Sequence, residues 1–512
     1  MKRWNRPHCP FSLSYVCLAG CVALLIGGVA MLTPCALTAQ EQTSEIAHTG
    51  SLPITSKSPE ARRLFDVGLV KLENLHGREA MQDFRHAVQM DPDFAMANIM
   101  ISFNSVDPSV DPAEQVAARN RANAARSKIS AGERLVIDWL TNSSEGKMVA
   151  AIQDMNDVLT QYPNDKFLAW LGAVWVENQQ QIRRAIPLFE RAIRLNPDFA
   201  PPMNELSYCY ARVRDFDKAF AMMQRYIALL PDESNPQDSY AEILRMAGRF
   251  DEALEHYHAS LKIDPSFVFS QLGIADTYAL MGDEARARIE YATAIQHATS
   301  KMEASMWRLQ SATSYLREGD TAQADTAFRA AAAQAHKDDL AVPEAEAWRM
   351  MAVYQSNHAS AMELLNKAEA VLAEKHPLPK SAQQQELALV LRDRAIRAAE
   401  AGNNALAEAV LKKLRDMAGA GHDQIIQIAS SAAIGAVLVK QSRYNEAIPY
   451  LEEDDRNPLS LRTLVLARQK TGAQAQADDL AKLLANWNEP TLEQALVTPQ
   501  FRAKQKGAVA VQ

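Results

Sequence analysis

The chain has 512 residues, and its 54 lysines and arginines against 62 aspartates and glutamates give a formal net charge of −8. Such an acidic chain lacks the basic surface that nucleic-acid-binding proteins carry, so nucleic acid is not an expected partner. Hydrophobic residues make up 48% of the chain and aromatic residues only 7%. Abundant alanine with few aromatic residues is typical of closely packed helices and argues against a β-sandwich.

Residues 1–39 have the pattern of an export segment. Lys2, Arg3 and Arg6 precede a stretch from residue 11 to residue 39 that contains no charged side chain. We expect a signal peptide or an N-terminal membrane anchor here. The following residues, 40–58, are rich in Ser, Thr and Gln, and this composition predicts a flexible linker.

Three fates of the N-terminal segment stay open. It is cleaved after Ala39, lipidated at Cys21, or kept as an anchor, since about 18 apolar residues can span a bilayer. Each fate places residues 40–512 outside a bacterial cytoplasm, periplasmic or secreted, with membrane association through residues 11–39 if the anchor is kept. Only Cys209 lies beyond this segment, so the body of the protein can form no internal disulfide, and we expect a buried, inert thiol.

An internal repeat dominates the rest of the chain. An alanine, in most units followed four residues later by a large apolar residue, recurs from residue 80 onward. The interval is 34 residues over the central part and loosens to between 30 and 46 residues further on. The marker alanines are Ala80, Ala117, Ala151, Ala185, Ala219, Ala253, Ala287, Ala324, Ala361, Ala407, Ala447 and Ala477.

Each unit also carries its own start and stop signals. A small residue twelve positions before the alanine lets two antiparallel helices approach closely, as at Gly68, Ala173, Ser207, Ala241, Ala275, Ala312, Ala395 and Gly435. A glycine five positions before it can end the first helix in a left-handed conformation, as at Gly146, Gly248, Gly282, Gly319, Gly402 and Gly472. A proline twelve positions after it cannot continue the second helix, as at Pro92, Pro163, Pro197, Pro231 and Pro265. One such hairpin cannot bury its apolar face alone, so neighbouring hairpins must stack.

This register resembles the tetratricopeptide repeat family over residues 59–485, with specific matches such as Arg249-Phe250-Asp251-Glu252-Ala253. The resemblance implies an all-α fold: an α-solenoid, a right-handed superhelix of about eleven or twelve helical hairpins. We expect a regular solenoid over 59–335, a divergent one with insertions over 336–487, and a closing helix and tail over 488–512.

The sequence offers no catalytic, cofactor-binding or metal-ligating constellation of a recognisable kind. His256 and His258 lie two positions apart on one helix and therefore point to opposite sides, which does not suit a shared metal ion. The acidic run from Glu452 to Asp455 is interpreted as a solvated helix end. The expected protein is therefore not an enzyme and needs no cofactor.

The resemblance assigns function to one face instead. In this family the first helices of the hairpins line a concave groove where peptides or partner helices dock. Carried over by register, the partner-binding residues are Phe167, Trp170, Asn178, Asn204, Tyr208, Arg212, Asp238, Glu242, Arg245 and Asp276. An alternative for Phe167 and Trp170 is that they only pack the core.

Two functions remain open at this point. One is a non-enzymatic scaffold outside the cytoplasm that binds a protein or peptide partner in its groove during cell-envelope assembly. The other is a regulatory or sensing subunit of an envelope enzyme or transport complex.

Overall fold

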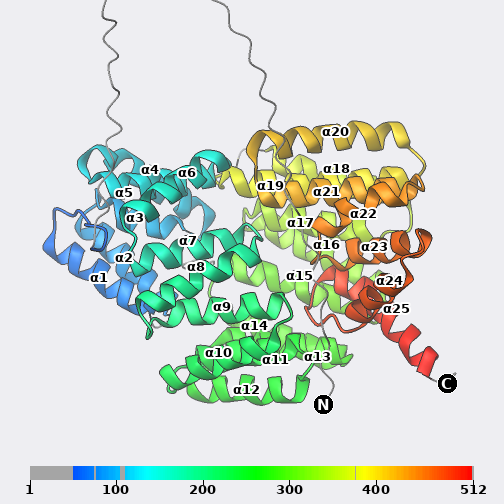
Figure 1. The fold of residues 1–512 in the computed structure, drawn as a ribbon, viewed down its shortest axis with the longest axis horizontal. Helices are drawn as coiled ribbons and strands as arrows, with labels where there is room; N and C mark the ends of the chain where they lie inside the picture. The colour runs from blue at the N-terminus through cyan, green and yellow to red at the C-terminus, as the bar shows by residue number, and fades with distance from the viewer. Residues whose placement is uncertain (1–49, 74–75, 104–109, 375, 510–512) are drawn as a thin grey trace, which may run out of the picture. The chain divides into compact units, whose positions relative to one another are not determined.

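The computed structural model describes residues 50–73, 76–103, 110–374 and 376–509, all within one compact unit. The described residues form twenty-five α-helices and one short 3-10 helix, with no β-strand among them (Figure 1). The expected export segment over residues 1–39 lies outside the described part of the chain. None of the helices in the described ranges is long and apolar enough to cross a membrane.

The helices pair into twelve consecutive antiparallel hairpins, as the all-α solenoid expectation requires. The first six hairpins are α1 (Pro59–Glu73) with α2 (Gly77–Met90), α3 (Ala95–Ser102) with α4 (Pro112–Ala125), α5 (Ala131–Ser144) with α6 (Met148–Gln161), α7 (Lys166–Asn178) with α8 (Ile182–Leu195), α9 (Ala200–Arg212) with α10 (Phe216–Leu229), and α11 (Ser234–Met246) with α12 (Phe250–Ile263). The 3-10 helix η1 (Arg126–Lys128) links α4 to α5.

The second six hairpins continue in the same order, and a single helix closes the array. They are α13 (Val268–Met281) with α14 (Glu284–His297), α15 (Lys301–Arg317) with α16 (Thr321–Lys337), α17 (Ala341–Tyr354) with α18 (His358–Ala373), α19 (Lys380–Glu400) with α20 (Asn404–Gly421), α21 (Gln424–Lys440) with α22 (Tyr444–Glu453), and α23 (Pro458–Lys470) with α24 (Gln474–Ala485). The last helix, α25 (Leu492–Val509), contacts α15, α23 and α24.

Two of the predicted small residues, both glycines, make close contacts between the two helices of their hairpins. A Cβ built on Gly68 would lie 2.6 Å from the ring of Phe84, and one on Gly435 would lie 2.6 Å from Leu451 Cγ. In both hairpins the large residue is the one predicted four positions after the marker alanine. Small residues on the first helix therefore act as sockets for large residues on the second, which is how interdigitated cores reach high packing density.

Nine of the twelve hairpins have a left-handed residue in their turn among the described residues, and the sequence predicts six of these nine. All six predicted turn glycines have φ between 74° and 90°. Three other hairpins place Gln180, Arg214 and Ser442 at the same turn position, with φ of 59°, 64° and 61°. The turn geometry is therefore kept even where the residue is not glycine, although a side chain is strained in this conformation.

The predicted register is confirmed at eleven of the twelve marker alanines, which are fully buried, and it is wrong at one. Ala117 is exposed, and its neighbour Ala118 occupies the buried position on α4. The longest interval, from Ala361 to Ala407, reflects the length of α19, which has 21 residues. The expected insertions of the C-terminal half are therefore partly extra helical turns.

Residues 51–57 do not form the flexible linker expected over 40–58. Leu52 is buried, and its amide donates to Asp165 Oδ2 over 2.8 Å. The hydroxyl of Thr55 donates to Glu133 Oε2 over 2.7 Å, and the amide of Lys57 donates to Asp91 Oδ2 over 2.8 Å. These hydrogen bonds fix the segment against the first hairpins.

Candidate functional site

Several of the predicted groove residues form one bonded row across α9, α11 and α13. Tyr208 donates its hydroxyl to Glu242 Oε2 over 2.9 Å. Arg245 reaches Glu242 Oε1 with one terminal nitrogen at 2.8 Å and Asp276 Oδ2 with the other at 2.7 Å. Tyr291 from α14 donates to Asp276 Oδ1 over 2.6 Å. Charge-assisted bonds of this kind are stronger than neutral ones, so the row joins three successive hairpins.

Two further predicted residues, Arg212 and Asp238, are bonded to neighbouring helices in the same way. Arg212 forms an ion pair with Glu177 of α7. Asp238 accepts a 2.7 Å hydrogen bond from the buried hydroxyl of Ser270. Burial raises the pKa of the Asp238 carboxyl to about 7, although the Ser270 hydrogen bond acts against that shift.

Phe167 and Trp170 belong to an aromatic cluster around Phe199. The ring centroids of Phe167 and Trp170 lie 5.2 Å and 6.2 Å from that of Phe199, in edge-to-face arrangements. Such pairs favour packing beyond the area they bury. The cluster therefore gives both residues a packing role in the core.

The structure thus brings the predicted residues together but leaves few of their side chains in solvent. Asn178 is exposed, whereas Phe167, Tyr208, Arg212 and Glu242 are half-buried. The remaining five are buried: Trp170, Asn204, Asp238, Arg245 and Asp276. A partner that used this face would meet a surface whose polar groups are already mostly bonded to one another.

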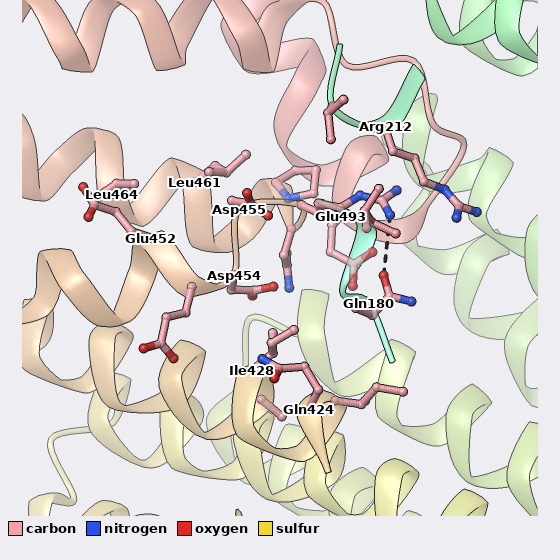
Figure 2. A pocket seen from close by; sticks show the side chains of 18 of the residues that line it. Gln180, Arg212, Gln424, Ile428, Glu452, Asp454, Asp455, Leu461, Leu464 and Glu493 are labelled. Atoms are coloured by element: carbon pink, nitrogen blue, oxygen red, sulfur yellow. Dashed lines mark hydrogen bonds between the residues drawn. The ribbon is translucent and has the colours of Figure 1, made fainter. Parts of the chain in front are cut away.

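A cavity of about 840 Å³ lies beside this row, where the turns after α7 and α9 meet α19, α21, the loop from residue 454 to 457, and residues 487–493 (Figure 2). Figure 2 shows Gln180 bonded across the cavity, and this contact is to Arg456 Nη1 at 3.5 Å. A cavity of this size is within the usual range for ligand sites.

Side chains of both charges line the cavity. We call Arg183, Arg184, Arg214 and Arg456 together the basic wall. We call the run from Glu452 to Asp455 together with Glu493 the acidic wall. The prediction that the acidic run is a solvated helix end is therefore wrong in part, because Asp454 is only 8% exposed and accepts a 2.6 Å hydrogen bond from Ser460.

Burial raises the pKa of two ionisable groups in this region, Asp454 and Cys209. It raises the pKa of Asp454 to about 6, helped by the charge of Glu493 and opposed by the Ser460 hydrogen bond and Arg392. Burial likewise raises the pKa of the Cys209 thiol, which leaves it protonated and unreactive at neutral pH, in line with the expected inert thiol.

Sequence reasoning misses the basic wall and Trp487, whose ring lies 5.1 Å from the Arg214 guanidinium. One signal is available. Gln180 and Arg214 replace the turn glycine of the repeat, and side chains kept in a strained left-handed turn are a reason to look for a role. The meeting of residue 214 with residue 487 has no local signal, because it depends on how distant hairpins stack.

The described residues contain no group of three or more His, Cys, Asp or Glu side chains placed to hold a metal ion. His256 instead contacts Gln237 Oε1 through Nδ1 at 2.6 Å and lies against the ring of Tyr240.

Comparison with known proteins finds a repeat family over part of the chain. A family model described as tetratricopeptide repeat matches residues 177–234. The chain is 33% identical over 86 residues to the anaphase-promoting complex subunit CDC16 of Saccharomyces cerevisiae, a match that covers 17% of this chain. It spans only 10% of the length of that relative.

Solved structures with a similar arrangement share little sequence with this chain. The Cut9-Hcn1 structure of an anaphase-promoting complex tetramer is 14% identical, covering 83% of this chain and 76% of that one, with a TM-score of 0.41. Yeast Tom70 is 15% identical, covering 83% and 98%, with a TM-score of 0.41. A tetratricopeptide repeat protein from Parabacteroides merdae is 12% identical, covering 61% and 100%, with a TM-score of 0.34.

Proposed function

We propose that the chain is a tetratricopeptide repeat scaffold that holds a protein partner outside the cytoplasm during cell-envelope assembly. The observation that carries the proposal is the cavity between the turns of α7 and α9 and the C-terminal hairpins. It is open, lined by charged side chains of both signs, and built on rigid stacked helices. Rigid elements that present a fixed set of polar groups favour specific binding, because little ordering is needed on association.

The bonded row beside the cavity supports this assignment. Arg245 joins α11 to α13 through Asp276, and Glu242 joins α11 to α9 through Tyr208, so these bonds keep the first helices in a constant relation to one another. The turn after α9, which lines the cavity, is thereby supported by side chains that need not contact the partner. Binding energy is concentrated in a few well-placed residues of such a surface.

Location is the second part of the proposal, and the export segment that the sequence predicts over residues 1–39 supports it. A reporter enzyme that works only outside the cytoplasm, fused after residue 60, is expected to be active. A reporter that works only in the cytoplasm should be inactive at the same position. The reverse pattern would overturn the proposed location and leave the scaffold function standing.

Affinity purification of the full chain from the envelope fraction tests the function itself. The scaffold function predicts that a non-catalytic envelope protein co-purifies in a fixed ratio. Co-purification of an enzyme or a transport complex instead would favour a regulatory or sensing subunit. No co-purifying protein in either the detergent-solubilised or the chemically cross-linked sample would contradict both.

A further inference from the structure

We propose that the basic wall of the cavity, through Arg184, Arg214 and Arg456, binds acidic side chains on an extended segment of the partner protein. This inference rests on the proposed function and adds the chemistry of the partner. It places the docking point at the turns between helices and at the loop after α22. The predicted groove residues on the first helices then stabilise the structure around the docking point but do not themselves contact the partner.

The first argument is the inventory of hydrogen-bonding groups. Four buried N–H donors that line the cavity have no acceptor among the described residues: Arg214 Nη2, Arg456 Nε, Arg468 Nε and Trp487 Nε1. No buried acceptor that lines the cavity is unpartnered in the same part of the chain. The unpartnered buried groups of the cavity lining are therefore all donors, and an ionised carboxylate is the side-chain group that offers only acceptors.

The second argument is charge. Arg183, Arg184 and Arg214 have no carboxylate partner within the described ranges, whereas Arg456 pairs with Glu489 at 3.0 Å. Burial lowers the pKa of Arg214, while the nearby charge of Glu489 raises it and that of Arg456 lowers it. Glu489 is one carboxylate near two guanidinium groups, so an incoming carboxylate would balance the second positive charge through charge-assisted hydrogen bonds.

The third argument comes from the backbone. Gln180 and Arg214 both line the cavity, and both occupy a left-handed turn position where six other hairpins have glycine. Glycine would remove the strain, but it would also remove the Arg214 guanidinium from the cavity. Arg214 therefore carries a side chain at a position where the fold alone favours none.

The acidic wall limits where the carboxylates of the segment can bind. Glu452 pairs with Arg468 at 2.7 Å, whereas Asp455 and Glu493 have no cationic partner among the described residues. Carboxylates of the partner would be repelled there. The acidic side chains therefore face Arg184, Arg214 and Arg456, and the part of the segment that crosses to the acidic wall is neutral or basic.

Fluorescence anisotropy with defined peptides tests the proposal on the full chain. The probe is a labelled, C-amidated hexapeptide with two glutamates, and its twin carries two glutamines. We expect the glutamate peptide to bind at least tenfold more tightly than the glutamine peptide. The preference should fall as salt is raised, because charges at an open cavity are screened.

Matched variants assign the effect to the basic wall. Arg214→Gln and Arg456→Gln should each reduce the affinity for the glutamate peptide about tenfold and leave the glutamine peptide unchanged. Arg443→Gln is the control, since Arg443 is an exposed arginine paired with Glu446 and does not line the cavity. Arg184→Gln changes an exposed side chain and keeps the test valid if a buried variant fails to fold.

The proposal is overturned if neither peptide binds, if both bind equally, or if Arg214→Gln, Arg456→Gln and Arg184→Gln bind the glutamate peptide as the parent does. These outcomes differ from failure of the proposed function. A partner that co-purifies equally with the parent and with Arg214→Gln would retain the scaffold function and reject the acidic docking point. A chain that prefers the glutamate peptide but has no envelope partner would retain the acidic docking point and reject the scaffold function.

Discussion

At the scale of single residues, the inner part of the array contains carboxyl groups that burial keeps partly protonated. Glu284 on α14 is 4% exposed, and neither of its carboxyl oxygens has a hydrogen-bond partner among the described residues. Burial raises its pKa to about 7, although the charge of Arg317 opposes the shift. The folded protein therefore binds a proton at Glu284 more tightly than the unfolded chain does.

Glu284 should make stability depend on pH in a defined direction. A raised pKa stabilises the folded state fully below the unfolded value of 4.5, and this contribution is lost as the pH rises through about 7. Glu284→Gln removes the titration, so we expect the variant to gain roughly 1–3 kcal/mol on the parent between pH 5 and pH 8. Urea unfolding at both pH values measures this difference. Glu255→Gln, at an exposed position on α12, is the control, and an equal gain in both variants would refute the assignment.

The left-handed turns give a second prediction at this scale. Ser442 has φ of 61°, so Ser442→Gly should stabilise the protein by about 0.5–1 kcal/mol by removing backbone strain. Gly282 has φ of 90°, and no atom lies within 4 Å of the place that a Cβ would take, so Gly282→Ala should destabilise the protein by about 1 kcal/mol through the backbone alone. Thermal unfolding of both variants checks the pair. A loss of stability in Ser442→Gly would mean that the hydroxyl matters more than the strain.

At the scale of elements, the hairpin is the unit that the sequence predicts best. Its signals are local: Gly435 and Leu451 lie in one hairpin, and their contact follows from a fixed spacing along the chain. The prediction is wrong at Ala117 because two adjacent alanines, Ala117 and Ala118, offer two registers, and only packing against neighbouring helices selects one. The extra length of α19 looks like an insertion in the sequence. A longer helix and an inserted loop lengthen the repeat interval in the same way, and only the positions of the turns tell them apart.

Close approach within a hairpin is open to a direct test. Gly435→Ala should cost roughly 1–3 kcal/mol of unfolding free energy, because the new methyl group would overlap Leu451. Gly419→Ala on α20 is the matched control, since nothing lies within 4 Å of its Cβ position, and it should stabilise the protein by about 0.5–1 kcal/mol. Guanidinium unfolding compares the two variants with the parent. Equal effects would contradict the socket role of Gly435.

At the scale of the whole described unit, contacts between distant hairpins create the candidate site. Asn488 donates to the carbonyl of Met246 at 3.4 Å, Arg502 donates to the carbonyl of Leu280 at 3.3 Å, and Arg317 reaches Gln494 Oε1 at 3.1 Å. These contacts bring the C-terminal residues onto the ends of α11, α13 and α15. Repeat patterns describe neighbours only, so they place each first helix correctly but give no information on which distant turns share a cavity.

The predicted groove residues illustrate this limit. Register assigns Tyr208, Arg245 and Asp276 to one face, and the structure does bring them together. Register cannot reveal that their polar groups bond mainly to one another, because those bonds depend on the tilt between hairpins. Arg214 and Trp487, which are 273 positions apart, meet only in the folded unit.

The most direct test of the central claim, that the cavity holds the partner, is site-specific photo-crosslinking of the full chain in intact cells. A photo-reactive amino acid at Gln424, which lines the cavity, should give a covalent adduct with one partner protein. The same amino acid at Ile289, whose side chain on α14 is 66% exposed away from the cavity lining, should give none. Adducts at residue 289 without any at residue 424 would contradict the account.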